Sequence, residues 1–200
     1  MFPYLFTRIT GKVSTGVRRA SRGRPIRGRT HGSGGRVPGM STHEENLSNS
    51  PLSGLASLGL RLPAVSAPKG AYTPAVASGP FVFVAGQIPL AGGALVREGH
   101  VGAGVSVDQA RELCRRCALS SLAAVHAEVG LERVTRIVKV TGYVATTPGF
   151  HDLDGVVDGA SELFAAVFGS RGEHARSVVG VADLPLRAPV KIETLVEIAG

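Results

Sequence analysis

The C-terminal part of the chain alternates between apolar and polar positions in two runs, joined by a connection at 184–189 that contains two prolines. A period of two is typical of β-strands, whose successive side chains point to opposite faces of a sheet. The second run has one apolar face and one mostly charged face, as a half-buried antiparallel strand should. Its two faces are Val190, Ile192, Thr194 and Val196 against Lys191, Glu193, Leu195 and Glu197.

The first run, 176–182, places one guanidinium on an otherwise apolar face. Arg176 alternates in step with Val178, Gly180 and Ala182. A charged side chain in this company is either solvated at the edge of a sheet or placed to bind an anion in an apolar groove. The pattern alone leaves both interpretations open.

Helical periodicity predicts two longer helices and one short one. Ser106 and Gln109 form a capping box, which predicts that a helix begins there, and Gly130 predicts that it ends near residue 129. A second helix is expected over about 153–168, and a short one within 52–62. The apolar stripe of the first long helix is Ala110, Leu113, Cys117, Leu122 and Val125.

Strand patterns complete the order of elements. A hairpin is expected from 71–77 and 81–85, and a β-branched run predicts a long strand at 134–145. The order is hairpin, helix, strand, helix and two strands, which predicts an α+β domain with a mixed sheet and two helices packed on one face. A sheet covered on one side only makes an oligomer physically reasonable.

The charge of the chain is concentrated in its N-terminal part. Residues 1–39 contain nine Lys and Arg and no acid, whereas the whole chain of 200 residues carries +7, so residues 40–200 carry −2. With few apolar residues among Arg, Gly and Ser, residues 1–53 are expected to be a disordered extension, and residues 54–200 to be the domain. A nearly neutral domain with few aromatic residues counts against nucleic-acid binding.

The basic extension has two other interpretations. An Arg-rich, acid-free segment with serines is also typical of an organellar transit peptide, which would place the protein in mitochondria. Alternatively, translation starts at Met40 and the extension is spurious. Otherwise we expect a cytoplasmic protein. The uncharged stretch at 73–96 is divided by prolines and glycines into strand-length pieces, so no membrane span is expected.

The chain has two cysteines, Cys114 and Cys117, so no disulfide framework is expected and a reducing compartment fits. Their CxxC spacing lies inside the first long helix, with no second pair and no neighbouring histidines. Packing is therefore a better interpretation than a zinc or redox site, and no metal is expected. Of the histidines, His174 shares a strand face with Arg176 and is a candidate cleft residue.

Four blocks of sequence resemble the reactive intermediate deaminase family (Rid or YjgF, also labelled endoribonuclease L-PSP). The C-terminal block reads A-R-S-x-V-x-V-A-x-L-P from residue 175, followed by V-K-I-E at 190–193. The other blocks are Gly70-Ala71-Tyr72 with Val84 to Pro89, the strand at 136–140 and the helix start at 157–161. The resemblance covers about residues 55–200 and rests on linked motifs rather than one.

This resemblance implies a chorismate-mutase-like fold that assembles as a homotrimer, with clefts between the subunits. It implies hydrolysis of reactive 2-imino or enamine acids to 2-oxo acids and ammonia, without a metal or organic cofactor. The partners would then be a small carboxylate and other copies of the chain. The family label also suggests RNA cleavage, but the nearly neutral charge of the domain counts against it.

By the same resemblance, Arg176 stands at the position that binds the substrate carboxylate, and a guanidinium suits a planar carboxylate well. Tyr72 stands at the aromatic position of the cleft. The backbone at Gly86 and Val178 falls where main-chain contacts are made. Ala85 replaces the serine that precedes the hairpin glycine.

Two further departures concern the residues that handle water. Counted from the Leu-Pro motif, the water-holding Glu falls on Lys191, and the helix Asn is Asp158. We hypothesise that Asp158 and Lys191 form a swapped pair, with Glu193 as the other candidate for holding the water. The alternative is a trimeric protein of the same fold that binds small carboxylates without turning them over.

Overall fold

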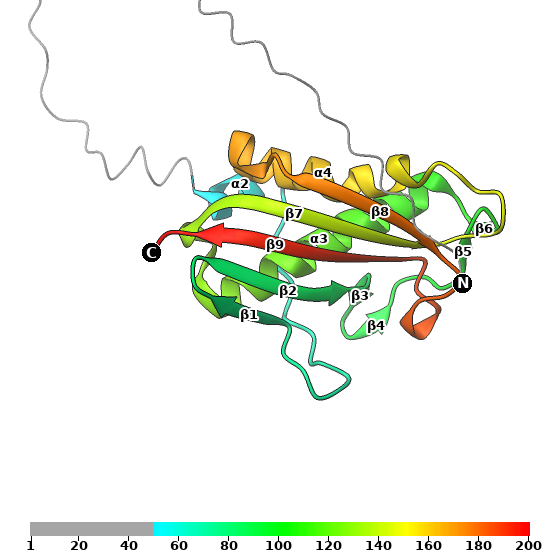
Figure 1. The fold of residues 1–200 in the computed structure, drawn as a ribbon, viewed down its shortest axis with the longest axis horizontal. Helices are drawn as coiled ribbons and strands as arrows, with labels where there is room; N and C mark the ends of the chain where they lie inside the picture. The colour runs from blue at the N-terminus through cyan, green and yellow to red at the C-terminus, as the bar shows by residue number, and fades with distance from the viewer. Residues whose placement is uncertain (1–49) are drawn as a thin grey trace, which may run out of the picture. The chain divides into compact units, whose positions relative to one another are not determined.

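The computed structural model describes residues 50–200 (Figure 1). The first 49 residues of the expected extension (1–53), with its transit-peptide and Met40 interpretations, lie outside the described residues. The described part forms a five-stranded sheet in the order β1-β2-β9-β7-β8, antiparallel except for β7 and β8, which are parallel. These strands are β1 (Ala75–Ser78), β2 (Phe81–Gln87), β7 (Val134–Ala145), β8 (Ala175–Val181) and β9 (Val190–Ile198).

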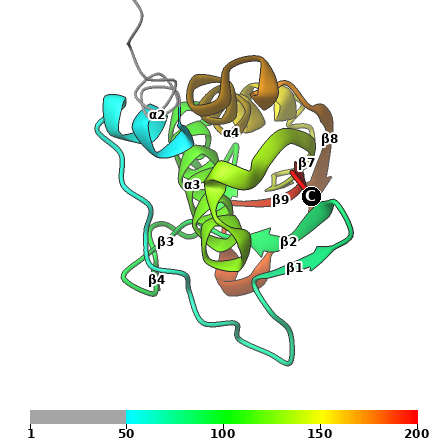
Figure 2. The same ribbon diagram turned by 90° about the vertical axis from the view of Figure 1, so that its left-hand side faces the viewer.

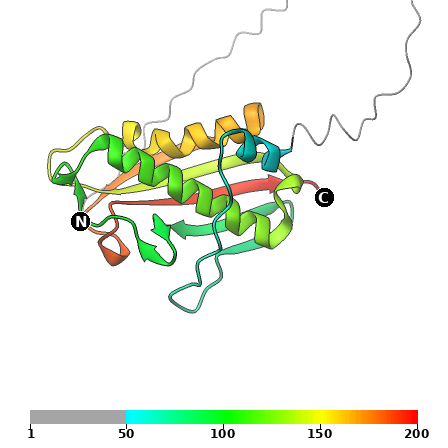
Figure 3. The same cartoon turned by 180° about the vertical axis from the view of Figure 1, so that it is seen from behind.

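Two long helices, α3 (Val107–Val129) and α4 (Leu153–Phe168), cover one face of this sheet, as Figures 2 and 3 show. A short helix, α2 (Pro51–Ser57), packs beside α4. The α+β prediction with two helices on one face of a mixed sheet is confirmed. The remaining elements are short: β3 (Leu90–Ala91), β4 (Ala94–Leu95), β5 (His100–Val101), β6 (Gly104–Val105), η1 (Leu131–Arg133), η2 (Gly169–Gly172) and η3 (Pro185–Arg187).

The local signals in the sequence fix where the helices begin. In α3, Ser106 accepts from the backbone N–H of Gln109 at 3.2 Å, and Gln109 accepts from the backbone N–H of Ser106 at 3.1 Å, so the predicted capping box is confirmed. All five residues of the predicted stripe are buried. The short helix α2 starts earlier than expected, because Ser50 caps it and Pro51 fits its first turn. Helical structure therefore begins within the last three residues of the expected extension.

The first strand of the hairpin begins later than expected. Strand β1 starts at Ala75, whereas the segment from Ala71 to Pro74 is not part of the sheet. The backbone N–H of Tyr72 bonds to the carbonyl of Gly70 at 2.9 Å in a tight turn, and Pro74 has no N–H to donate to a ladder. Tyr72 is consequently placed on a loop.

Strand β9 is central and carries the predicted alternation along its whole length. Val190, Ile192 and Val196 are fully buried beneath the helices. The side chains between them, including Lys191 and Glu193, lie on the face that no helix covers and are only half-buried. This face also exposes large apolar side chains, since Val76 and Phe83 on β1 and β2 are each 52% exposed.

The helix layer packs closely because of one glycine. A methyl group at Gly159 of α4 would overlap the backbone carbonyl oxygen of Arg111 in α3. We therefore expect Gly159→Ala to lower the free energy of unfolding by about 1–3 kcal/mol, the usual penalty for overpacking. Urea unfolding would measure this. Gly180→Ala on β8 is the matched control, because its methyl group would find its nearest neighbours at 3.5 Å and should change stability by less than about 0.5 kcal/mol. Equal effects of the two variants would contradict this account of the packing.

Candidate functional site

A cavity of about 460 Å³ lies where strand β2 leaves the sheet. Its walls come from the loop before β1, the end of β2, the η3 turn and the start of β9. Two ammonium groups, Lys69 and Lys191, belong to these walls, and no Asp or Glu does. The cavity therefore favours an anion with an apolar body. Its apolar lining consists of Ala67, Pro68, Pro74, Ala85, Ile88, Leu90, Pro185 and Leu186.

Four of the residues predicted for the site line this cavity: Tyr72, Ala85, Gly86 and Lys191. The pairing of β2 with β9 shifts register between Val84 and Gln87, which is a β-bulge. Lys191 runs directly over the bulge, so a side chain at Gly86 would lie 2.6 Å from its Cδ atom. Gly86 thus leaves the space through which Lys191 reaches the cavity.

Lys191 belongs to a polar group on the face of the sheet that no helix covers. Its Nζ lies 3.4 Å from Oε1 of Glu193, and 4.6 Å above the ring of Tyr143 on β7. The Tyr143 hydroxyl donates to Oε2 of Glu193 at 3.0 Å. The Glu193 carboxylate is thereby held from both sides, by a phenol and by an ammonium.

Sequence reasoning missed Tyr143. The alternation along 134–145 places it on the polar face of its strand, but its partner follows only from register. The structure pairs Tyr143 with Lys191 directly across the ladder of β7 and β9. The pKa of Tyr143 is raised above its ordinary value. The largest cause is the hydrogen bond to Glu193, and partial burial and the negative charge of Glu193 contribute less.

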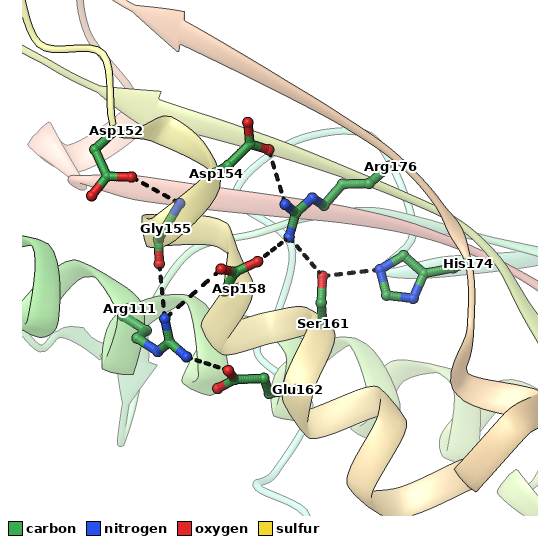
Figure 4. A network of polar contacts seen from close by, with 9 residues as sticks. All are labelled: Arg111, Asp152, Asp154, Gly155, Asp158, Ser161, Glu162, His174 and Arg176. Carbon is green, nitrogen blue, oxygen red and sulfur yellow. Dashed lines mark hydrogen bonds and ion pairs between the residues drawn. The ribbon is translucent and has the colours of Figure 1, made fainter.

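Arg176 lies in a different cluster, between β8 and α4 (Figure 4). Its Nη1 donates to Asp158 at 2.6 Å and to Ser161 at 3.1 Å, and its Nη2 donates to Asp154 at 2.9 Å. Its side chain is 24% exposed. Partial burial disfavours the charge, but Asp158 and then Asp154 outweigh it and hold the pKa of Arg176 above the ordinary range.

The neighbours of this guanidinium make the cluster acidic. Arg111 of α3 pairs with Glu162, and lies 3.9 Å from Asp158. Counted with Asp154, the three carboxylates exceed the two guanidinium groups, so the cluster carries a net charge of −1. Asp154 is 79% exposed, so its ion pair with Arg176 contributes little to stability.

The other predicted site residues near Arg176 have structural contacts. The Oγ of Ser161 lies 3.0 Å from Nε2 of His174, whose other ring nitrogen lies 2.7 Å from the carbonyl oxygen of Gly172. His174 therefore holds Ser161 in place beside the guanidinium rather than opening into the cavity. Val178 follows Arg176 on the same side of β8 and packs against the core.

The predicted site residues are thus divided between the two sides of the sheet. Arg176 pairs in register with Val140, which is buried under the helices, whereas Lys191 pairs with Tyr143 on the uncovered face. Within this chain, Asp158 pairs with Arg176 and Lys191 pairs with Glu193. The hypothesised pair of Asp158 and Lys191 is therefore not formed within one copy.

Two further sequence interpretations concern metals and membranes. Cys114 and Cys117 are both fully buried in α3, and burial raises the pKa of both thiols, as expected of packing residues. Within residues 50–200, no group of three or more His, Cys, Asp or Glu side chains is placed to hold a metal ion. No helix in the same range is both long and apolar enough to cross a membrane.

Comparison with known proteins identifies the family to which the chain belongs. The sequence model of the family described as "YjgF/chorismate mutase-like, putative endoribonuclease" matches residues 52–198. The chain therefore belongs to the YjgF/chorismate mutase-like family.

Individual relatives are similar to this chain over most of their own length. Protein TCP17 of Trypanosoma cruzi is 40% identical over 148 residues, which is 72% of this chain and 91% of the relative. A protein of Dermatophagoides farinae named 2-iminobutanoate/2-iminopropanoate deaminase is 33% identical over 136 residues, covering 68% and 92% of the two chains. Among solved structures, a protein of unknown function from Agrobacterium tumefaciens superimposes with a TM-score of 0.71 at 36% identity, covering 78% of this chain and 98% of its own.

The Tyr143–Glu193 hydrogen bond can be tested by titration. Because the neutral phenol is favoured in the folded state, its contribution to stability is present below the ordinary tyrosine pKa of about 10 and is lost as the pH rises through the raised value. We expect the ultraviolet absorbance of phenolate to show one tyrosine that ionises at a pH above the ordinary tyrosine pKa. Tyr143→Phe should remove that step, and Glu193→Gln should shift it downward. Tyr72→Phe is the control and should leave the step unchanged; its loss in that variant would refute the assignment.

Proposed function

We propose that the protein is an imine deaminase that hydrolyses 2-imino or enamine acids to 2-oxo acids and ammonia. The observation that carries this proposal is the ion pair of Lys191 and Glu193 at the edge of the cavity. Lys191 lines the cavity, whereas Glu193 lies outside its lining. The family membership and the relative named 2-iminobutanoate/2-iminopropanoate deaminase support it. The free, buried thiols support a reducing compartment, and we expect the cytoplasm.

The reaction needs a cation for the carboxylate and a base for the water. In our proposal Lys69 and Lys191 attract the substrate carboxylate. Glu193 does not line the cavity but contacts Lys191 at its wall, and there it takes a proton from a water molecule while the oxygen of that water bonds to the imine carbon. The C=N electron pair moves to nitrogen, which takes up a proton. The C–N bond of the resulting carbinolamine then breaks, ammonia leaves, and the hydroxyl gives up its proton to leave a 2-oxo acid. One water is consumed, and no redox step is involved.

In our proposal, Arg176 of one copy of the chain acts at the cavity of a second copy. Arg176 and Lys191 face opposite sides of the sheet in one copy, so a ligand can touch both only where two copies meet. Strand β8 is at the edge of the sheet, where a neighbour can approach it. The uncovered face, with Val76 and Phe83 half exposed, supports assembly into the homotrimer that the family resemblance implies. Asp158 then orients Arg176, and the exposed Asp154 gives way to the substrate.

Substitutions separate the proposed roles. We expect Lys191→Ala to raise KM at least about tenfold, because a charged contact to the carboxylate is lost. Glu193→Gln should lower kcat about a hundredfold with little change in KM, as expected for a lost general base. Release of 2-oxo acid from freshly generated imino acids measures both. Lys139→Ala is the matched control, because this lysine donates to Ser177 at 2.6 Å and does not line the cavity. Full activity of Glu193→Gln would show that Glu193 is not the general base.

Mixing two impaired variants tests whether the site is shared. Arg176→Ala and Lys191→Ala should each lower kcat/KM. When the two are unfolded together and refolded in equal amounts, about a quarter of the clefts regain both side chains if each cleft takes one residue from each copy. Activity should therefore reappear in the mixture. A mixture no more active than its components would show that the two residues do not serve one cleft.

The alternative is a protein of the same fold that binds carboxylates without turnover. It is favoured by the net negative cluster that surrounds Arg176, which leaves that guanidinium without excess positive charge in a single copy. Calorimetric binding of 2-oxo acids together with no release of 2-oxo acid from imino acids would support this alternative. Turnover that depends on Glu193 would exclude it.

A further inference from the structure

The rim of the cavity contains an unusual stretch of backbone. Leu186 and Arg187, in the η3 turn, have φ values of 58° and 60°. They are the non-glycine residues with positive φ in the described part of the chain. A left-handed conformation costs a residue with a Cβ about 1–3 kcal/mol, and such strain persists only where the surroundings enforce it.

Two hydrogen bonds within the turn and one from Gly99 hold this conformation. The backbone N–H of Arg187 bonds to Leu184 at 3.0 Å, and its carbonyl accepts from Gly99 at 3.0 Å. Ala188, which follows, is fully buried and donates to Pro185 at 3.1 Å. The turn is therefore fixed at both ends, and its strained residues cannot relax without breaking these bonds.

The result is a leucine side chain held at the cavity rather than in the core. Leu186 lines the cavity and is 46% exposed. The turn geometry holds Leu186 at the wall of the cavity, so its exposed apolar surface is fixed there rather than free to pack elsewhere. A side chain fixed in this way is a preformed wall for an apolar ligand group, because it need not be ordered when the ligand binds.

The other walls set the chemistry of that group. Pro74, Ile88, Leu90 and Pro185 add apolar surface, while the cations Lys69 and Lys191 account for the charge. The volume of about 460 Å³ falls within the range of about 300–1,000 Å³ in which pockets hold ligands much larger than a three-carbon acid.

We propose that the cavity selects monocarboxylic acids that carry a bulky apolar side chain, branched aliphatic or aromatic, and that Leu186 is the residue that sets this preference. The inference rests on the proposed function in one respect only, namely that the selected acids are the 2-imino acids and their 2-oxo products. The carboxylate lies toward Lys191, and the apolar group packs against Leu186.

Binding of unreactive 2-oxo acids to the full chain tests the preference without requiring catalysis. By isothermal titration calorimetry, we expect 4-methyl-2-oxopentanoate and phenylpyruvate to bind at least about tenfold more tightly than pyruvate, as one or two apolar contacts allow. Leu186→Asn should reduce this ratio to below about threefold. Asparagine tolerates the left-handed conformation, so the variant keeps the turn and loses only the apolar wall. Leu186→Gly, which also relieves the strain, should give the same loss.

Leu52→Asn is the control, because this leucine of α2 is 38% exposed and does not line the cavity. It should leave the ratio unchanged. Pyruvate binding as tightly as the larger acids, or an unchanged ratio in both Leu186 variants, would overturn the inference, as would no binding of any of the three acids.

Turnover distinguishes this inference from the proposed function. Imino acids can be generated from alanine, leucine and phenylalanine with an amino-acid oxidase. If none is hydrolysed while the binding preference holds, the proposed deaminase fails and the selectivity of the cavity stands. If all are hydrolysed and the three 2-oxo acids bind equally, the deaminase stands and the selectivity fails.

Discussion

The alternation of side chains along β9 is the constraint on which the rest of the structure depends. Val190, Ile192 and Val196 must face the helices to complete the core, and this requirement leaves Lys191 and Glu193 on the uncovered face. A slip of one residue would bury both charges. The same pairing that stabilises the sheet therefore brings an ammonium and a carboxylate together beside a cavity, with Tyr143 as their cross-strand neighbour.

The separation of Arg176 from Lys191 follows from the same geometry. Strand β8 lies at the edge of the sheet and turns Arg176 toward α4, where Asp154 and Asp158 bind it. A guanidinium with two carboxylate partners is well oriented but has no excess charge with which to attract an anion by itself. We therefore assign the attraction of substrate to Lys69 and Lys191 together, two ammonium groups at a cavity with no acid in its lining, and Arg176 has a role only where a second copy brings it to the cavity.

Much of the fold could be predicted from the sequence because its signals are local. The capping box at Ser106, the strand at 134–145 and the alternation on β9 each depend on spacing within one element, and all three are confirmed. The site was harder to predict, because its members meet through register and loop conformation. The pairing of Tyr143 with Lys191 depends on how β7 aligns with β9, and the position of Leu186 depends on two left-handed residues that no local pattern indicates.

The most direct test of the central claim is a crystal structure of the full chain grown with 4-methyl-2-oxopentanoate. The account predicts that the ligand carboxylate lies within hydrogen-bond distance of Lys191 on the uncovered side of the sheet, with the methyl groups against Leu186. A ligand bound to Arg176 on the helix side of a single copy, away from Lys191, would contradict it.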